Sequence, residues 1–475
     1  MEVHVSLTDR RRLSEQIYRQ LRAGIRAGRL PATEALPSSR ELAERLDVSR
    51  NTVVAAYERL AAEGLVRSRP GSGVFVSEPA TAPATPYRTE PDSYPQPQPV
   101  WDTLGSSHYD ATAAPEIDMR AGIPSREHFP YAAWRARISR QLRPSVLGTS
   151  AYGEPAGSPA LREAIAAHIG VSRGVRAEPE EVFVTSGTQQ AIDLAARVLL
   201  APGDLVAVED PCYRPPAMLF RSLHLRVAGV PVDDEGLVVD AIPAGVRLVY
   251  VTPSHQFPLG MSLSTRRRRQ LLDWADRTGA VIVEDDYDTE FRYGGRPLEP
   301  LQSLDRSWRV LYVGSFSKTL LPTLRLGFLL APPSLRPALR TAKLVTDWHT
   351  SGPMQAALAE FISSGAFARH IRRMRRTYEE RHQLVVSIVD SEFAGCLVRI
   401  PSAAGIHVTG LLRPEVGRTD DEIVRLALRR GVDVSLPVSA LAVTGPPRHG
   451  LVIGYGAVPT DRIPEGLRRL RECVS

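Results

Sequence analysis

The stretch SFSKTLLPTLRLGF, from Ser315 to Phe328, follows the apolar run Val310–Gly314, which predicts a buried strand. Lysine occurs at only two positions, Lys318 and Lys343, although the chain contains 59 Lys and Arg residues. A chain that uses Arg for solubility and ion pairs can keep Lys for chemistry that a guanidinium cannot perform, such as forming a Schiff base. The alternative is that Lys318 is an ordinary exposed lysine.

The neighbours of Lys318 favour the covalent interpretation. The hydroxyls of Ser315 and Ser317 and the cation of Arg325, seven residues after the lysine, suit an anionic group such as a phosphate. Enzymes that use pyridoxal phosphate hold this cofactor on a lysine. We therefore predict pyridoxal phosphate bound covalently to Lys318.

The whole chain has the composition of a soluble, multidomain protein. Its 475 residues predict two or three domains, and its 43% hydrophobic and 24% charged residues are typical of globular proteins. No apolar run is long enough to span a membrane, the N-terminus lacks a signal-peptide pattern, and the three cysteines are scattered. We expect a cytoplasmic protein without a metal or disulfide framework, and the net charge of +6 permits a nucleic-acid partner.

Three short helices are predicted near the N-terminus. Apolar residues recur at helical spacing in Leu13–Arg26, a second helix follows Ser38 or Ser39 as its N-cap, and a third covers about Arg50–Ala62 with Ser49 as its N-cap. A tight connection joins the second helix to the third. This pattern predicts a helix-turn-helix.

Two short strands follow these helices. Leu65–Arg69 and Val74–Val76 flank the turn Pro70–Gly73, so they predict a β-wing. The start of the third helix is then expected to meet base edges in the major groove, while arginines of the second helix and the wing meet phosphates. The alternative is a helical-hairpin interaction domain. The predicted DNA-binding residues are Arg40, Ser49, Arg50, Asn51, Thr52, Arg67 and Gly71, with Arg69 also available for a phosphate.

Residues 1–76 resemble the GntR family of bacterial DNA-binding domains. The resemblance rests on LPSSRELA (residues 36–43), VSRNTV (48–53), LAAEGL (60–65) and GSGVFV (71–76). It implies a winged helix-turn-helix that binds double-stranded DNA. The Pro-rich segment 77–116 then reads as an extended linker, because it has too little apolar surface to fold alone. Trp101 and Leu104 offer apolar side chains for docking its later half, although the sequence does not predict such docking.

From Ile117 onward, strand and helix patterns alternate, which predicts an α/β fold with a mostly parallel sheet. The strand Val182–Thr185 leads through a small polar turn that contains Gly187 and Thr188 into a helix over Ala191–Leu199. Such a turn at a helix N-terminus can cradle a phosphate, although the pattern alone is weak.

A second telling stretch is VIVEDDYD, residues 281–288, where a buried strand ends in carboxylates. Ligands of α/β folds lie at this edge of the sheet. Pyridoxal phosphate needs a carboxylate at its pyridine nitrogen, and a phenol can donate to the ring oxygen. The alternatives are a solvated strand end or a divalent-metal site, and too few oxygen ligands can be assigned for a metal.

The order Ser-Gly-Thr, Asp-x-Tyr and Ser-x-Ser-Lys-x₆-Arg resembles fold-type I aminotransferases. Joined to a GntR-like domain, it resembles the MocR/GabR family of bacterial regulators over essentially the whole chain. Further matching pieces are MRAGIP (119–124), YGEPAG (152–157), EDPCY (209–213) and TPSHQFPLG (252–260). The resemblance implies a cofactor-binding domain over 117–475, with a smaller C-terminal subdomain from about residue 350.

The resemblance also implies roles for individual residues. Lys318 carries the cofactor, Tyr213 stacks on its ring, Tyr287 meets the ring oxygen and Asp285 faces the pyridine nitrogen, with Asp286 and Glu284 as alternatives to Asp285. The phosphate is expected among Gly187, Thr188, Ser315 and Arg325.

Two departures from the aminotransferase pattern bear on function. Phe257 stands where these enzymes often carry Asn, and Val452 stands where many carry an Arg that clamps a substrate carboxylate. Arg448 is the nearby candidate to replace that Arg.

Because a bidentate clamp is hard to replace, we favour a transcriptional regulator that senses pyridoxal phosphate or an amine or amino acid, with vitamin B6 or amino-acid metabolism as its output. An aminotransferase with an appended DNA-binding domain is the alternative, and weak transaminase activity is compatible with the residues present. A homodimer is expected.

Overall fold

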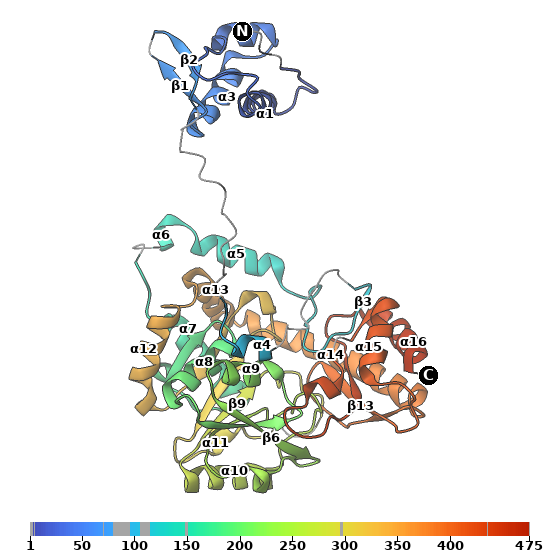
Figure 1. Cartoon of the computed structure of the whole chain (residues 1–475). Helices are drawn as coiled ribbons and strands as arrows, with labels where there is room; N and C mark the ends of the chain where they lie inside the picture. Colours follow the sequence, from blue (N-terminus) through green and yellow to red (C-terminus); the bar gives the residue numbers. More distant parts are fainter. Residues whose placement is uncertain are drawn as a thin grey trace. The chain divides into compact units, whose positions relative to one another are not determined.

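The computed structural model describes residues 3, 5–69, 71–78, 96–104, 115–147, 151–294, 298–434 and 436–474. The chain divides into two compact units, residues 1–96 and 97–475 (Figure 1). Each unit is described by itself. Most of the predicted linker lies outside the described residues. In the part of the chain that the structure describes, no helix combines the length and the apolar character needed to cross a membrane.

The N-terminal unit is a three-helix domain with a two-stranded wing, as predicted. Its second and third helices begin at side-chain caps: Ser38 Oγ accepts from the Glu41 N–H, and Ser49 Oγ accepts from the Thr52 N–H. The apolar faces of the helices meet in one core around Ile17, Leu42 and Val53. The elements are α1 (Leu13–Arg26), α2 (Ser39–Arg45), α3 (Arg50–Ala62), β1 (Val66–Arg69) and β2 (Gly73–Val76).

An eight-stranded sheet forms the centre of the second unit. Its order is β4-β11-β10-β9-β8-β5-β6-β7, and the run from β10 to β6 is parallel, whereas β11 and β7 are antiparallel to their neighbours. The strands are β4 (Val182–Thr185), β5 (Leu205–Asp210), β6 (Arg226–Asp233), β7 (Gly236–Leu237), β8 (Val246–Val251), β9 (Val281–Asp286), β10 (Val310–Ser315) and β11 (Gly327–Leu330). The predicted mostly parallel α/β fold is therefore confirmed.

Helices cover both faces of this sheet (Figure 1). Alternate strand residues serve opposite faces: Phe183 and Leu311 pack with α8, α9 and α12, whereas Val184 and Tyr312 pack with α7 and α13. The long apolar runs of the sequence follow from this double burial. The helices are α5 (Tyr131–Gln141), α6 (Pro144–Leu147), α7 (Pro159–Arg173), α8 (Thr188–Leu199), α9 (Arg214–Ser222), α10 (Thr265–Thr278), α11 (Leu301–Leu304), α12 (Arg336–Thr346) and α13 (Gly352–Ser363).

The C-terminal part of this unit has a sheet and a core of its own. The order of its three strands is β12-β13-β15, and all pairs are antiparallel. A short parallel pair joins β3 to β14, so the first strand of the unit lies in the C-terminal part. The elements are β3 (Ile117–Asp118), α14 (Ala366–Glu392), β12 (Leu397–Arg399), β13 (His407–Leu412), α15 (Asp420–Arg429), β14 (Val432–Asp433), β15 (Gly450–Gly454) and α16 (Ile463–Val474).

Two local features differ from the expectations. Helix α8 begins at Thr188 instead of Ala191, because Gly187, with φ of 82°, turns the chain directly into the helix. The end of the predicted linker forms a short helix, α4 (Val100–Leu104), which packs against α9 and buries Leu104. A five-residue helix gives too short a sequence pattern to predict this docking.

Candidate functional site

A cavity of about 280 Å³ lies at the carboxyl ends of the parallel strands. Thr188 follows β4, Asp285 lies near the end of β9 and Ser315 ends β10, so separate segments of sequence converge there. The predicted residues that line this cofactor pocket are Thr188, Tyr213, Asp285, Tyr287, Ser315, Lys318 and Arg325. Gly187 is adjacent to the guanidinium of Arg325.

Lys318 is one of the residues that line the pocket. Its Nζ donates to the carbonyl of Gly122 at 2.8 Å. Burial lowers the pKa of Lys318, although Asp288 and Asp285 act against this effect. Gly122 has a φ of 75°, and a Cβ at this position would lie 2.8 Å from Nζ. The glycine therefore leaves room for a lysine amine that is more easily deprotonated than an exposed one.

The side chains of the three acids at the end of β9 alternate between the two faces of the sheet. Glu284 accepts from the N–H groups of Leu301 and Gln302 at 2.9 Å. Asp286 pairs with Arg173 at 2.8 Å, away from the cofactor pocket, and only Asp285 lines that pocket. The alternation of strand side chains therefore selects Asp285 among the three candidates. It also separates the acids, so they do not form one metal site.

Asp285 has one carboxylate oxygen without a partner. Its Oδ2 accepts from the hydroxyl of Tyr250 at 2.7 Å, whereas its Oδ1 is buried and makes no hydrogen bond to any residue that the structure describes. Burial raises the pKa of Asp285 to about 7, against the hydrogen bond from Tyr250. A buried acceptor without a donor is costly, and the protonated ring nitrogen of pyridoxal phosphate is a donor of the required kind. The residues therefore fit this cofactor.

Asp285→Asn should stabilise the cofactor-free protein at pH 8 by about 1–3 kcal/mol. The folded-state pKa of about 7 exceeds the ordinary value of 3.8, so the native protein holds a proton that the unfolded chain releases. The free energy of unfolding therefore falls as the pH rises from about 3.8 to about 7. Urea unfolding at pH 5 and pH 8 checks the expectation, because the gain should be smaller at pH 5. An equal effect at both values would contradict it.

Arg325 occupies the end of the pocket predicted to hold phosphate. Its Nη2 donates to the carbonyl of Ser186 at 2.6 Å, beside the N-terminus of α8. A Cβ on Gly187, whose φ is 82°, would lie 3.0 Å from the same guanidinium. Thr188 and Ser315 also line this pocket. A cation, hydroxyls and a helix N-terminus are the donors that bind phosphate.

The two predicted tyrosines lie in the pocket, with a buried network behind one of them. The hydroxyl of Tyr287 donates to the carbonyl of His255 at 3.0 Å and lies 3.0 Å from its Nδ1. That Nδ1 is also 3.0 Å from Asp288. Tyr213 lies edge-on to Phe257, with ring centroids 5.7 Å apart. Burial raises the pKa of Tyr287, so its phenol keeps its proton and remains a donor.

Several residues of the site were not predicted as site residues. The cofactor pocket is also lined by Tyr250, Thr252 and His407, and the His255 ring contacts the hydroxyl of Tyr287. His255 belongs to the quoted motif TPSHQFPLG, but nothing in the sequence indicates that it contacts Tyr287. Tyr250 lies in an apolar strand, where its hydroxyl is indistinguishable from a core tyrosine by pattern alone.

The two departures from the aminotransferase pattern form an apolar cluster. Val452 is buried on β15 and belongs to the same cluster as Phe257, Leu259 and Leu441. Arg448 is exposed and is not part of the pocket lining. The position that the resemblance assigns to a carboxylate clamp is therefore apolar here, and Arg448 lies outside the lining of the cofactor pocket.

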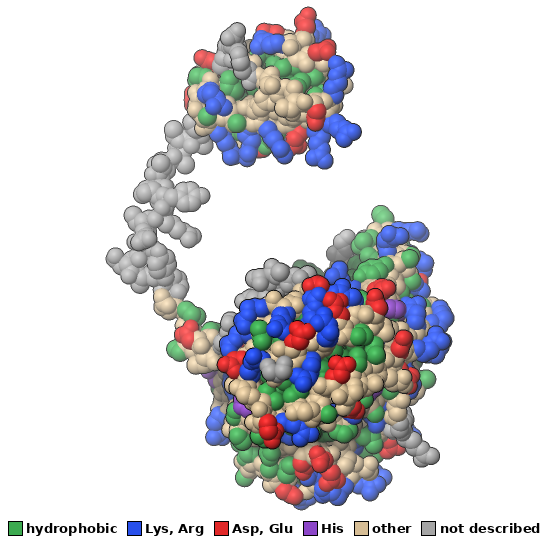
Figure 2. Space-filling model, turned by 90° about the vertical axis from the view of Figure 1, so that its right-hand side faces the viewer, with side chains coloured by type: hydrophobic (Ala, Val, Ile, Leu, Met, Phe, Trp, Pro, Cys, Tyr) green, Lys and Arg blue, Asp and Glu red, His purple; other side chains and the backbone are tan. Residues whose placement is uncertain are grey.

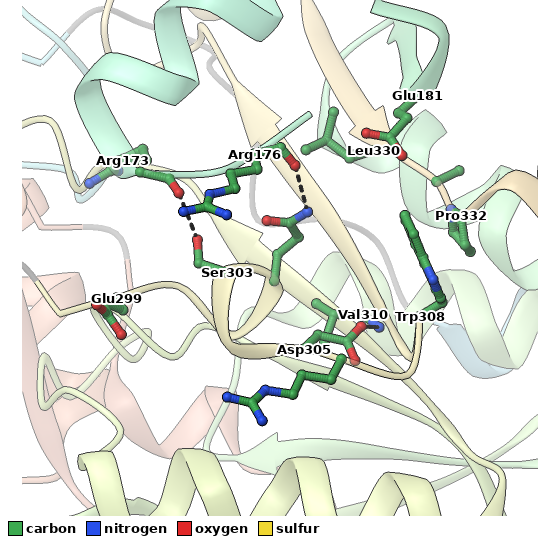
Figure 3. A pocket seen from close by; sticks show the side chains of 14 residues that line it. Arg173, Arg176, Glu181, Glu299, Ser303, Asp305, Trp308, Val310, Leu330 and Pro332 are labelled. Atoms are coloured by element: carbon green, nitrogen blue, oxygen red, sulfur yellow. Dashed lines mark hydrogen bonds between the residues drawn. The ribbon is translucent and has the colours of Figure 1, made fainter. Parts of the chain in front are cut away.

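A larger cavity, of about 530 Å³, lies at the opposite ends of the same strands (Figure 3). Glu181 precedes β4, Val310 begins β10 and Leu330 ends β11, so this cavity is on the far edge of the sheet from Lys318. It contains acids and arginines, and Arg173 at its edge extends to Asp286. No predicted site residue lines it.

The predicted DNA-reading residues are exposed or partly exposed on the N-terminal unit. Arg40, Arg50, Asn51 and Arg67 are exposed, and Gly71 lies in the wing turn with φ of 76°. Ser49 and Thr52 hydrogen-bond each other at the start of α3. Figure 2 shows Arg side chains along the rim of this unit. Arg69 lies over the ring of Phe75, 5.0 Å from its centroid, so the wing holds it in place.

Arg67→Ala should weaken binding to mixed-sequence duplex DNA and lower the slope of log affinity against log salt by about 1. The reason is that each Arg–phosphate contact releases about one counterion. Arg197→Ala, an exposed change in the other unit, is the control. A salt titration by fluorescence anisotropy checks the slope, and an unchanged slope would remove Arg67 from the DNA contacts.

Comparison with known proteins identifies both parts of the chain. The family described as bacterial regulatory proteins, gntR family, matches residues 13–76, and aminotransferase class I and II matches residues 116–447. The chain is 37% identical to the probable rhizopine catabolism regulatory protein MocR of Rhizobium meliloti, over 97% of this chain and 93% of that protein. It is 32% identical to the pyridoxine biosynthesis transcriptional regulator PdxR of Corynebacterium glutamicum, over 98% and 95%.

A solved structure agrees with this assignment for the larger unit. LysN, an α-aminoadipate aminotransferase from Thermus thermophilus, is 30% identical and superposes with a TM-score of 0.72, covering 79% of this chain and 96% of that one. The enzyme-like part therefore has the fold-type I aminotransferase fold. With the helix-turn-helix in front of it, the chain belongs to the MocR-type transcriptional regulators, in which a GntR-type domain is joined to an aminotransferase-like domain.

Proposed function

We propose that this regulator holds pyridoxal phosphate covalently on Lys318, and that the state of this pocket controls binding of the N-terminal domain to an operator. The observation that carries the proposal is the convergence of three complementary groups in one cavity. These are the partly buried amine of Lys318, a buried carboxylate oxygen of Asp285 that has no donor among the described residues, and the guanidinium of Arg325 at the N-terminus of α8.

Each side chain has a role toward the cofactor. Lys318 forms the covalent link, Asp285 keeps a proton on the ring nitrogen, Tyr213 covers the ring and Tyr287 donates to the ring oxygen. Gly187, Thr188, Ser315 and Arg325 hold the phosphate. When bound, pyridoxal phosphate supplies an aldehyde that links to amines and a ring that absorbs visible light.

Two signals are compatible with this pocket. The signal is pyridoxal phosphate itself, or it is an amine or amino acid that reacts with the bound cofactor. The apolar position Val452 disfavours ordinary α-amino acids, and one relative is named as a regulator of pyridoxine biosynthesis. Control of vitamin B6 or amino-acid metabolism is the corresponding output.

The alternative function is transamination. Transamination is favoured by the presence in the pocket of Lys318, Asp285 and Arg325. The cluster of Val452 and Phe257 argues against it, because a substrate carboxylate finds no cation there.

The proposed organisation is a cytoplasmic homodimer that binds paired half-sites. Residues 1–76 read DNA through Arg40, Ser49, Arg50, Asn51, Thr52, Arg67 and Gly71. Residues 77–116 are the spacer, and residues 117–475 bind the cofactor and effector. Two copies of the reading domain suit the two-fold symmetry of paired half-sites.

The visible spectrum of the purified protein with added pyridoxal phosphate tests the proposal. A yellow band that borohydride bleaches is expected. If amines then shift the band, the effector is an amine, whereas an inert band favours pyridoxal phosphate as the signal. A protein that stays colourless with excess cofactor would overturn the proposal and leave only its DNA-binding half.

A further inference from the structure

A second cavity, of about 500 Å³, adjoins the cofactor pocket. Four side chains line both spaces, so they form the boundary between the two. The shared residues are Gln189, Tyr213, Phe257 and Leu436. We call this second cavity the side chamber.

The lining of the side chamber is mostly apolar. Its polar members are largely engaged: Gln189 donates to the carbonyl of Pro215 at 3.1 Å, and Ser222 donates to the carbonyl of Leu219 at 2.7 Å. Arg214 is the one charged side chain of the lining, and among the described residues its guanidinium makes no hydrogen bond or ion pair. The apolar lining residues beyond the shared ones are Trp101, Leu104, Pro215, Met218, Leu219, Ala440 and Leu441.

One wall of the side chamber is α4, the short helix in the later half of the predicted spacer. Leu104 and Trp101 of this helix line the chamber together with Met218 and Leu219 of α9. The hydrogen bonds of α4 are local, such as that from Thr103 Oγ1 to the carbonyl of Val100. Among the described residues, the contacts of α4 with α9 are made by apolar side chains. Filling the chamber therefore adds to the contacts that hold this helix.

These observations point to a class of effector. We propose that the side chamber takes the aromatic group of an arylalkylamine whose nitrogen reacts at the cofactor, and that the filled chamber fixes α4 in place. This inference rests on the proposed function of Lys318. An aromatic ring suits the apolar walls, and a guanidinium such as that of Arg214 can lie against its face. The cluster around Val452 is apolar and offers no cation to a carboxylate, so the proposed effector is an amine without an α-carboxylate.

The covalent step is an exchange of amines. With pyridoxal phosphate held on Lys318, the effector nitrogen would form a C=N bond to the aldehyde-derived carbon while the C=N bond from that carbon to Lys318 Nζ would break. Two protons pass from the incoming nitrogen to the released lysine amine. No oxidant or reductant is consumed.

The inference is tested by titrating the cofactor-loaded full chain with 2-phenylethylamine and with ethylamine while following the visible band. Phenylethylamine should reach half-saturation at a concentration about 10- to 100-fold lower than ethylamine does, because burial of its phenyl group strengthens binding by this factor. Met218→Trp fills the chamber and should abolish the preference without changing the ethylamine response. Val171→Trp, at a position 92% exposed on α7, is the matched control and should keep it.

Hydrogen exchange of residues 97–104 tests the connection to the spacer. Phenylethylamine should slow exchange in this segment, and ethylamine should not. Equal half-saturation for both amines, or a preference that survives Met218→Trp, would overturn the inference while the cofactor proposal stands. A preference without a change in exchange would overturn the role of α4. Absence of any visible band with added cofactor would instead overturn the proposed function itself.

Discussion

Lys318→Ala abolishes the yellow band and leaves no cofactor attached after borohydride reduction; this is the expected result with the largest effect. The chain has only two lysines, so covalent attachment through a lysine side chain has only two possible sites. Lys318 Nζ lies in the cofactor pocket, and burial lowers its pKa. Lys343 is buried in α12 and pairs with Asp347 at 2.6 Å.

Lys343→Met is the matched control, because methionine keeps the buried aliphatic volume of the side chain. It should retain the full band and gain the mass of one pyridoxyl group per chain after reduction. Intact-mass spectrometry of both variants reads this result directly. Attachment in Lys318→Ala, or its loss in Lys343→Met, would show that Lys318 is not the covalent site.

Arg173→Met is the second change with a large expected effect, a loss of about 3–5 kcal/mol in the free energy of unfolding. The side chains of Arg173 and Asp286 are only 8% and 1% exposed, and their ion pair is 2.8 Å long. Burial alone would lower the pKa of Arg173, but Asp286 and Glu290 raise it overall. Removing the cation leaves the Asp286 charge buried, and among the described residues only the hydroxyls of Tyr312 and Thr289 then donate to it.

Urea unfolding followed by tryptophan fluorescence measures this loss. All five tryptophans lie between residues 101 and 348, so the signal reports the larger unit alone. Arg197→Ala is the control, because its pair with Asp193 lies on the surface with Arg197 48% exposed. It should cost about 0–1 kcal/mol. A loss in Arg173→Met no greater than this would show that the buried pair adds little.

The sequence predicts the fold well because its signals are local. Caps such as Ser38 and Ser49, and the apolar runs of strands buried on both faces, each lie within a few residues. The lysine motif also carries its phosphate-binding candidate, Arg325, within seven residues. These parts of the site are therefore predictable from the chain alone.

Other parts of the site depend on which way a side chain points. Three consecutive acids end β9, and only their placement on opposite faces of the sheet distinguishes Asp285 from Glu284 and Asp286. His255 reaches Tyr287 across 32 residues of sequence. The docking of α4 depends on a gap beside α9 that the spacer sequence does not encode. Such long-range contacts leave no periodic pattern in the chain.

The scarcity of lysine has a consequence for regulation in the cell. Residues 1–96 contain no lysine, so every side-chain cation of the DNA-reading unit other than histidine is an arginine. Acetylation, which neutralises lysine side chains and weakens their grip on nucleic acid, has no side-chain target there. The positive charge of this unit is thus protected from the enzymes that acylate lysine. Under the proposed function, ligands of the larger unit would control DNA binding by this unit without any change to its arginine charges.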